Sequence, residues 1–130
     1  MTGARPLALL VTHGALGREL VRTVEAILGP QTEVDTLSND GLSADGLRAA
    51  IEERIRAAPA AQPVFLFTDL AAGSCGIASR RVDCADRPVR RLTGVNLPML
   101  LEFFHYRDTM PVDELVARLE TKGKAGIIIF

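Results

Sequence analysis

Two polar side chains come directly after the most apolar segments of the sequence, and their chemical types suit the transfer of a phosphoryl group. His13 follows the apolar residues 7–11, and Gly14 leaves its imidazole open because glycine has no side chain to shield the ring. Asp69 follows the apolar residues 63–68 and can accept a hydrogen bond from one ring nitrogen. Such a bond fixes the tautomer and leaves the other nitrogen free as a nucleophile.

Gly73 and Ser74 supply the groups that would hold a phosphate. They stand where a helix is expected to begin, so backbone N–H groups, a hydroxyl and the positive end of the helix dipole all favour a negative charge there. The residues therefore predict a phosphohistidine site made by His13, Asp69, Gly73 and Ser74. The alternative is a surface histidine without a chemical role, because a His-Gly pair alone is common.

Other reactive residues have simpler interpretations. His105 is expected on the solvent side of a helix, with a structural role. Cys75 stands at the expected helix N-terminus, where the dipole lowers the pKa of a thiol, so a redox role is the alternative to an inert thiol. The most basic stretch is interpreted as a solvated face, with a docking surface for an acidic partner as the alternative; it contains Arg80, Arg81, Arg87, Arg90 and Arg91.

The sequence contains no spacing of Cys and His that is typical of a metal site, no P-loop and no dinucleotide-binding fingerprint. We therefore expect no metal and no cofactor. The two cysteines, Cys75 and Cys84, are expected to be reduced thiols of a cytoplasmic protein.

Length, composition and charge exclude several classes of protein. The 130 residues suffice for one domain, 1–130, and 48% hydrophobic with 24% charged residues exclude a disordered chain. A net charge of -1 lacks the positive excess of a nucleic-acid-binding protein, so we expect no nucleic-acid partner. No apolar run is long enough to span a membrane, and residues 7–11 are too few for the core of a signal peptide.

The strands and helices that position these side chains can be predicted from the sequence, and they alternate along the chain. Fully apolar runs or short β-rich runs predict strands at residues 7–11, 34–37, 63–68, 89–94 and 126–130. Helical periodicity predicts helices from Leu16 to Leu28, from a cap at Ser43 or Asp45 to Ile55, and over residues 74–83, 97–106 and 112–122.

Alternation of this kind predicts an α/β fold: one doubly wound, mostly parallel sheet in 2-1-3-4 order. Ligands of such sheets bind at the carboxyl ends of the strands. In this order the strands before His13 and Asp69 are neighbours, so the two side chains are expected to face each other across a shallow crevice.

The sequence also resembles the IIA domain of the mannose/fructose/sorbose family of the phosphoenolpyruvate:sugar phosphotransferase system, over nearly its whole length. The motifs that carry the resemblance are LVTHG at 10–14, AILG at 26–29, FLFTD at 65–69, GS at 73–74, ASR at 78–80 and GVNLPML at 94–100. Ala72 and Cys75 stand where the family usually has a glycine and a proline. Because alanine rarely adopts a positive φ, the loop is expected to lie differently under the phosphate.

The resemblance implies a function and partners. The histidine matched by His13 takes a phosphoryl group from the phosphocarrier HPr and passes it to a IIB domain, which makes the protein a transferase of sugar transport, linked to the membrane only through the transporter. The aspartate matched by Asp69 orients the ring, and the serine matched by Ser74 touches the phosphate. The family fold forms a homodimer that exchanges its C-terminal strand, for which residues 126–130 are the candidate strand and 122–124 the candidate hinge.

Two other functions remain open at this stage. The chain could be a regulatory phosphoprotein that reports phosphorylation state to a partner without sugar uptake. It could also be a small-molecule-binding α/β domain in which His13 has no chemical role.

Overall fold

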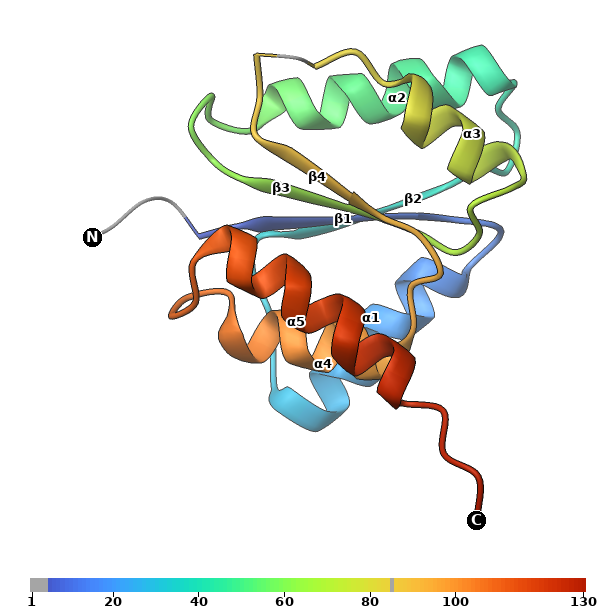
Figure 1. Ribbon diagram of the computed structural model, residues 1–130. Coiled ribbons are helices and arrows are strands. Elements are labelled where there is room, and N and C mark those ends of the chain that lie inside the picture. Colours follow the sequence, from blue (N-terminus) through green and yellow to red (C-terminus); the bar gives the residue numbers. More distant parts are fainter. Residues whose placement is uncertain (1–4, 85) are drawn as a thin grey trace.

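The computed structural model of the chain describes residues 5–84 and 86–130, which form a single α/β domain around one parallel sheet (Figure 1). The strand order is β2-β1-β3-β4, which confirms the predicted 2-1-3-4 order. The elements are β1 (Leu7–Thr12), α1 (Leu16–Leu28), β2 (Val34–Ser38), α2 (Ala44–Ala57), β3 (Val64–Thr68), α3 (Ser74–Arg81), β4 (Val89–Leu92), α4 (Leu97–Tyr106) and α5 (Val112–Ala125).

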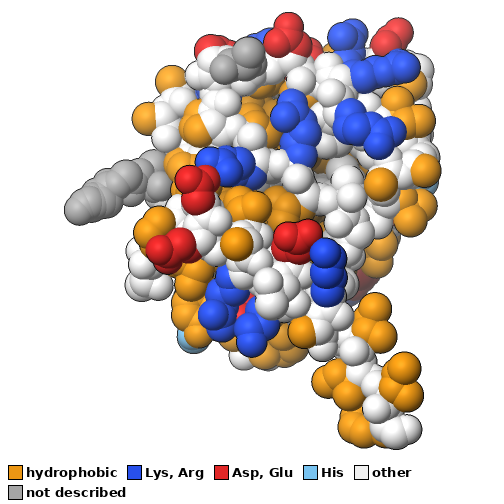
Figure 2. Space-filling model, viewed as in Figure 1, with side chains coloured by type: hydrophobic (Ala, Val, Ile, Leu, Met, Phe, Trp, Pro, Cys, Tyr) orange, Lys and Arg blue, Asp and Glu red, His pale blue; other side chains and the backbone are white. Residues whose placement is uncertain are grey.

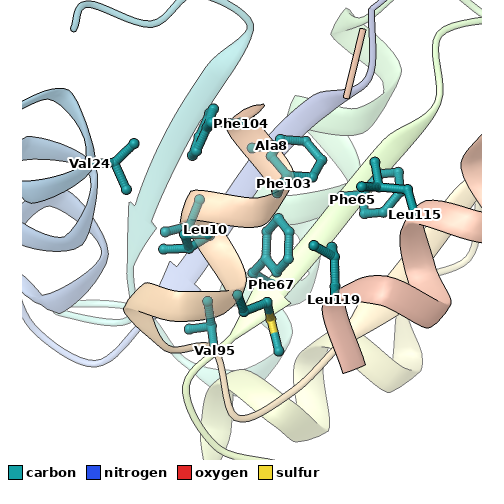
Figure 3. Close-up of a cluster of buried hydrophobic side chains, with 12 residues drawn as sticks. Ala8, Leu10, Val24, Phe65, Phe67, Val95, Phe103, Phe104, Leu115 and Leu119 are labelled. Carbon is teal, nitrogen blue, oxygen red and sulfur yellow. The ribbon is translucent and has the colours of Figure 1, made fainter. Parts of the chain in front are cut away.

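Helices cover both faces of the sheet, because the two central strands are apolar on both sides. Helices α2 and α3 cover one face, and α1, α4 and α5 cover the other (Figure 1). Side chains alternate along a strand, so Leu9 and Leu66 point toward α2 and α3 while Leu10 and Phe67 point toward α1 and α4. Figure 3 shows the second of these clusters, in which the ring of Phe103 lies edge-on to that of Phe67 at 5.3 Å between centroids.

The register of the parallel strands determines which loops meet. Val11 of β1 lies opposite Thr68 of β3, so the chain leaves both strands side by side, toward His13 and Asp69. On the other flank, Thr12 lies opposite Ser38 of β2, which brings Asn39 beside the same loop. The carboxyl ends of β1 and β3 thus converge on one place, as the sequence predicts, and the end of β2 joins them.

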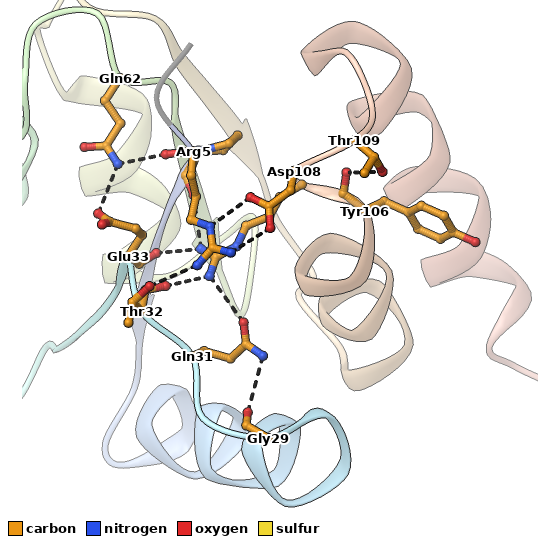
Figure 4. Close-up of polar contacts among 11 residues, drawn as sticks. Arg5, Gly29, Gln31, Thr32, Glu33, Gln62, Tyr106, Asp108 and Thr109 are labelled. Atoms are coloured by element: carbon orange, nitrogen blue, oxygen red, sulfur yellow. Dashed lines mark hydrogen bonds and ion pairs between the residues drawn. The ribbon is translucent and has the colours of Figure 1, made fainter. Parts of the chain in front are cut away.

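A buried arginine joins the opposite end of the sheet to α4. Arg107 is 2% exposed, and its guanidinium donates to the backbone carbonyls of Pro6, Thr32 and Glu33 at 3.2, 2.6 and 2.9 Å. Burial, together with the nearby charge of Arg5, lowers the pKa of Arg107 to about 10, so it remains charged at neutral pH. Arg5 extends the same network toward Asp108 (Figure 4).

The C-terminal segment differs from the prediction. Residues 126–130 form no strand in this chain, and α5 continues to Ala125 rather than ending at 122. The candidate hinge at 122–124 is also wrong, because these residues are helical and Gly123 is buried against Met99. The side-chain amide of Asn96 donates to the Gly123 carbonyl at 3.1 Å and so fixes this last turn.

Several predicted ends shift by a few residues. Strand β4 ends at Leu92, before Gly94 turns the chain with a φ of 72°, and α3 ends at Arg81. In the basic stretch Arg80, Arg81 and Arg91 are exposed, as a solvated face predicts, but two of its arginines also bind the backbone. Arg87 and Arg91 donate to carbonyls at the ends of α2 and α3, namely those of Ala58, Ser79 and Val82.

Within residues 5–84 and 86–130, none of the helices combines the length and the apolar character that crossing a bilayer requires.

Candidate active site

His13 and Asp69 meet at the carboxyl end of the sheet, as the sequence predicts. Nδ1 of His13 lies 2.8 Å from Oδ2 of Asp69, and the backbone N–H of His13 donates to the same oxygen at 3.0 Å. The other carboxylate oxygen of Asp69 accepts the N–H of Leu70 at 3.0 Å. The imidazole side chain is 41% exposed and the carboxylate only 10%, so solvent reaches the ring while its partner is shielded.

Asp69 is held in its charged form. Burial alone would raise its pKa, but the hydrogen bonds from the backbone N–H and the ring of His13 outweigh that effect and lower the pKa of Asp69 below its usual value. A carboxylate at Nδ1 holds the proton on that nitrogen. Nε2 is then the ring nitrogen with a free lone pair.

Gly73 and Ser74 lie beside Nε2, at the start of α3. The hydroxyl of Ser74 is 3.4 Å from Nε2, and a Cβ at Gly73 would lie 3.5 Å from Cε1 of the ring. Gly73 has a φ of 94° and precedes the first turn of α3, whose end no side chain caps. Its conformation therefore needs glycine, and the backbone N–H groups of this helix end are available to an anion.

The replacement of a glycine by Ala72 does not force a strained loop. Among the described residues, Glu33 is the one non-glycine residue with a positive φ, so Ala72 adopts an ordinary conformation. In this loop it is the next residue, Gly73, that has a positive φ. The expectation that Ala72 displaces the loop is therefore not supported by its backbone geometry.

Asn39 contacts the loop that carries His13, which sequence reasoning missed. Its side-chain oxygen accepts the N–H of Gly14 at 3.1 Å, and its own N–H donates to the carbonyl of Thr12 at 3.2 Å. Gly14 has a φ of 56°. Asn39 thus holds the residues on either side of His13, opposite the face held by Asp69. In the sequence it stands in a stretch of turn-forming residues, and nothing local indicates this long-range contact.

Cys75 lies beneath the site and is fully buried. Burial, reinforced by the charge of Asp69, raises the pKa of the Cys75 thiol to about 11. This raised pKa favours the interpretation as an inert thiol over the redox alternative, because loss of solvent outweighs the helix dipole here. One ligating atom each from His13, Asp69 and Cys75 lie within 4.8 Å of one another, and these three residues could hold a metal ion.

His105 does not join the site. It is exposed on α4, and its ring lies edge-on to Tyr106 at 4.5 Å between centroids. Apolar side chains are exposed on the loops and helix starts that carry His13, Asp69 and Asn39. These are Leu16, Leu42, Leu70 and Ile77, which are 45%, 42%, 57% and 37% exposed.

Comparisons with known proteins agree with one another. The family model EIIA-man, described as the PTS system fructose IIA component, matches residues 8–120. The PTS system mannose-specific EIIAB component of Escherichia coli (strain K12) is 30% identical over 118 residues, which are 89% of this chain but 36% of that protein. The chain thus spans little more than a third of this relative.

Solved structures of similar proteins have the same fold. The phosphotransferase system component EIIA from Streptococcus agalactiae is 26% identical with a TM-score of 0.85, over 96% of this chain and 97% of that one. The mannose/sorbose specific IIA subunit from Enterococcus faecalis is 23% identical with a TM-score of 0.81, over 98% and 96%.

Proposed function

The chain belongs to the EIIA-man family of the phosphoenolpyruvate:sugar phosphotransferase system (PTS) and is a phosphotransfer component of that system, and on this premise we propose that His13 accepts the phosphoryl group from HPr and passes it to a IIB domain. The observation that supports this role is the asymmetric setting of the ring. The carboxylate of Asp69 is hydrogen-bonded to Nδ1, while Nε2 faces the hydroxyl of Ser74 and the glycine before it.

In the proposed step the lone pair of Nε2 attacks phosphorus, and an N–P bond forms as the bond from phosphorus to the donor group of phospho-HPr breaks. The electrons of the broken bond stay with the donor group of HPr. The Nδ1 proton stays between His13 and Asp69, and the carboxylate stabilises the positive charge that develops on the imidazole. The second transfer repeats the exchange with the IIB domain as acceptor.

The start of α3 holds the transferred group. The hydroxyl of Ser74 and the backbone N–H groups of the first turn can donate to phosphoryl oxygens, and the helix dipole favours their charge. Gly73 leaves the space beside the ring open, because a side chain there would contact His13. Phosphate is therefore bound by backbone and hydroxyl groups of α3.

The exposed apolar side chains around the site are the proposed contact surface for HPr and the IIB domain. Leu16 and Leu70 come from the segments that directly follow His13 and Asp69, so a protein that covers them brings its own phosphoryl-carrying or phosphoryl-accepting group close to Nε2. Such a surface of large apolar side chains is typical of an interaction site.

The proposed function is tested by incubating the protein with phosphoenolpyruvate, enzyme I and HPr, followed by measurement of the intact mass. We expect the mass of one phosphoryl group to be added per chain, and to be lost again on addition of a cognate IIB domain. A chain that gains no phosphoryl group while HPr is fully phosphorylated would contradict the proposal.

We further propose that the protein forms a homodimer in which residues 127–130 of each chain cover the open edge of β4 in the other. The side chains of Ile127, Ile128, Ile129 and Phe130 are 81%, 68%, 93% and 113% exposed, and the segment stands clear of the domain (Figure 2). In the described residues, β4 pairs with β3 alone, so its outer edge is free.

A groove beside this edge supports the proposed exchange. It has a volume of about 480 Å³ and is lined in part by Leu92 of β4, Met99 of α4 and Val116 of α5. Burial of four large apolar side chains is worth about 6–12 kcal/mol per subunit before the cost of ordering the segment. A symmetric exchange buries both segments and closes both sheet edges.

Deletion of residues 127–130 is expected to convert the dimer into monomers, because it removes the segment that pairs with the partner. Light scattering at micromolar concentration measures the mass of the full-length and shortened chains. Ile27→Asp, an exposed site on α1, is the control and should leave the dimer intact. A full-length monomer, or a shortened chain that remains a dimer, would contradict the proposal.

Asn39→Ala is expected to slow phosphorylation of His13 about fivefold, since a hydrogen bond such as that to the Gly14 N–H is worth about 1 kcal/mol. The initial rate of phosphoryl uptake from phospho-HPr measures the effect. Ser43→Ala is the matched control, because it removes the cap of α2 in the same loop and lowers stability without touching residues 12–14. An unchanged rate in Asn39→Ala would show that the contact does not position the histidine.

A further inference from the structure

We propose that His13, Asp69 and Cys75 bind a thiophilic divalent cation such as Zn²⁺, and that the bound ion prevents phosphorylation of His13. The binding site stands on the geometry of these three residues, and the block of phosphorylation rests on the function proposed above. The three side chains come from the end of β1, the end of β3 and the first turn of α3. Their positions in the sequence gave no sign of a shared site.

The distances suit a small tetrahedral ion after modest movement. One ligating atom from each residue lies within 4.8 Å of the other two. Zinc binds nitrogen, oxygen and sulfur at about 2.0–2.3 Å, which places ligand atoms about 3.5 Å apart in a tetrahedral site. Closure by about 1 Å is therefore needed. The half-exposed imidazole of His13 can adjust its distances to the other two ligands by side-chain rotation, while the Nδ1–Oδ2 pair, now 2.8 Å apart, opens slightly as the ion enters.

The donor set selects the kind of ion. An imidazole nitrogen, a carboxylate oxygen and a thiolate sulfur are ligands that Zn²⁺ accepts together, whereas Mg²⁺ and Ca²⁺ require oxygen ligands. On binding, the sulfur of Cys75 loses its proton to solvent and forms a bond to the metal. Three protein ligands leave a fourth position open toward the exposed side of the His13 ring, where a water molecule can complete the tetrahedron.

An ion bound to either ring nitrogen of His13 prevents phosphoryl transfer. An ion on Nε2 takes the lone pair that attacks phosphorus. An ion on Nδ1 displaces the proton that is shared with Asp69 and removes the hydrogen bond that orients the ring. An ion on Nε2 and a phosphoryl group on Nε2 exclude each other, because both need that nitrogen and the space beside Ser74.

Cobalt provides a direct test on the purified full-length chain, without any phosphotransferase partner. Co²⁺ replaces Zn²⁺ in such sites, and a cobalt–thiolate bond gives a charge-transfer absorption band in the near ultraviolet. We expect this band at one ion per chain in the wild-type protein. Cys84→Ala is the matched control, since Cys84 is the second buried free thiol and lies beyond the far end of α3. It should keep the band.

Cys75→Ala should lose the band and bind Zn²⁺ at least about tenfold more weakly in a competition titration, since loss of a mere hydrogen-bond partner of a ligand already costs that much. Cys75→Ser serves as a second variant if alanine impairs folding. Metal-free Cys75→Ala should still take up phosphate from phospho-HPr, so a failure of the metal site and a failure of the proposed function are distinguishable. Absence of the band in the wild-type protein, or an equal band in Cys75→Ala, would overturn the proposal.

The functional consequence is measured on the same proteins. At a Zn²⁺ concentration of about ten times Kd, about one wild-type chain in eleven is metal-free, so the phosphorylation rate should fall about tenfold. The rate of Cys75→Ala should fall far less at that concentration. Equal inhibition of both proteins would overturn the proposed block, because the ion would then act without the thiol.

Discussion

His13→Ala is expected to abolish phosphorylation by phospho-HPr completely, because no other nucleophile in the site can replace the imidazole. The hydroxyl of Ser74 lies 3.4 Å from Nε2, so the substitution also removes the base that could activate this hydroxyl. The wild-type adduct should be stable in base and labile in acid, as a phosphorus–nitrogen bond to imidazole is. Intact-mass measurement of both proteins after incubation with phosphoenolpyruvate, enzyme I and HPr gives the result.

The chain contains its own control for this experiment. His105 is exposed on α4 and does not contact the site, so His105→Ala should be phosphorylated as fast as the wild-type protein. Phosphoryl label that persists in His13→Ala, or that disappears in His105→Ala, would assign the acceptor to another residue.

Asp69→Ala is expected to keep the fold and slow phosphoryl transfer by about 10²–10⁴, the range for loss of an orienting or acid–base group. The substitution leaves Nδ1 and the backbone N–H of His13 without their common acceptor. The ring is then free to rotate, and no carboxylate stabilises the charge that develops on it. Rapid-quench measurement of phosphoryl uptake, with circular dichroism to check the fold, tests this expectation.

Asp69→Asn separates orientation from charge. Its amide oxygen can accept both hydrogen bonds from His13, but its NH₂ group would face the N–H of Leu70, which now donates to the other carboxylate oxygen. We therefore expect a rate between those of the wild-type protein and Asp69→Ala. Transfer at the normal rate in Asp69→Ala would show that the aspartate only supports the loop.

Much of the fold could be read from local patterns. The runs over β1 and β3 are apolar on both faces, which occurs where helices cover a parallel sheet on both sides, and the alternating helical periods supply those helices. His13, Asp69, Gly73 and Ser74 follow from the same pattern. Each stands at a strand end or a helix start, and parallel strands bring all such ends to one edge.

The sequence by itself therefore determined the strand order, the layers and the pair of groups at the carboxyl ends of β1 and β3, because hydrophobic burial and turn chemistry act over a few residues. Only the tertiary structure decided the contacts of Asn39, the depth of Cys75 beneath His13, and the extension of α5 to Ala125. Each of these depends on atoms from segments far apart in the chain. An asparagine in a turn, a cysteine at a helix start and an apolar segment after a helix are each compatible with several structures until packing selects one.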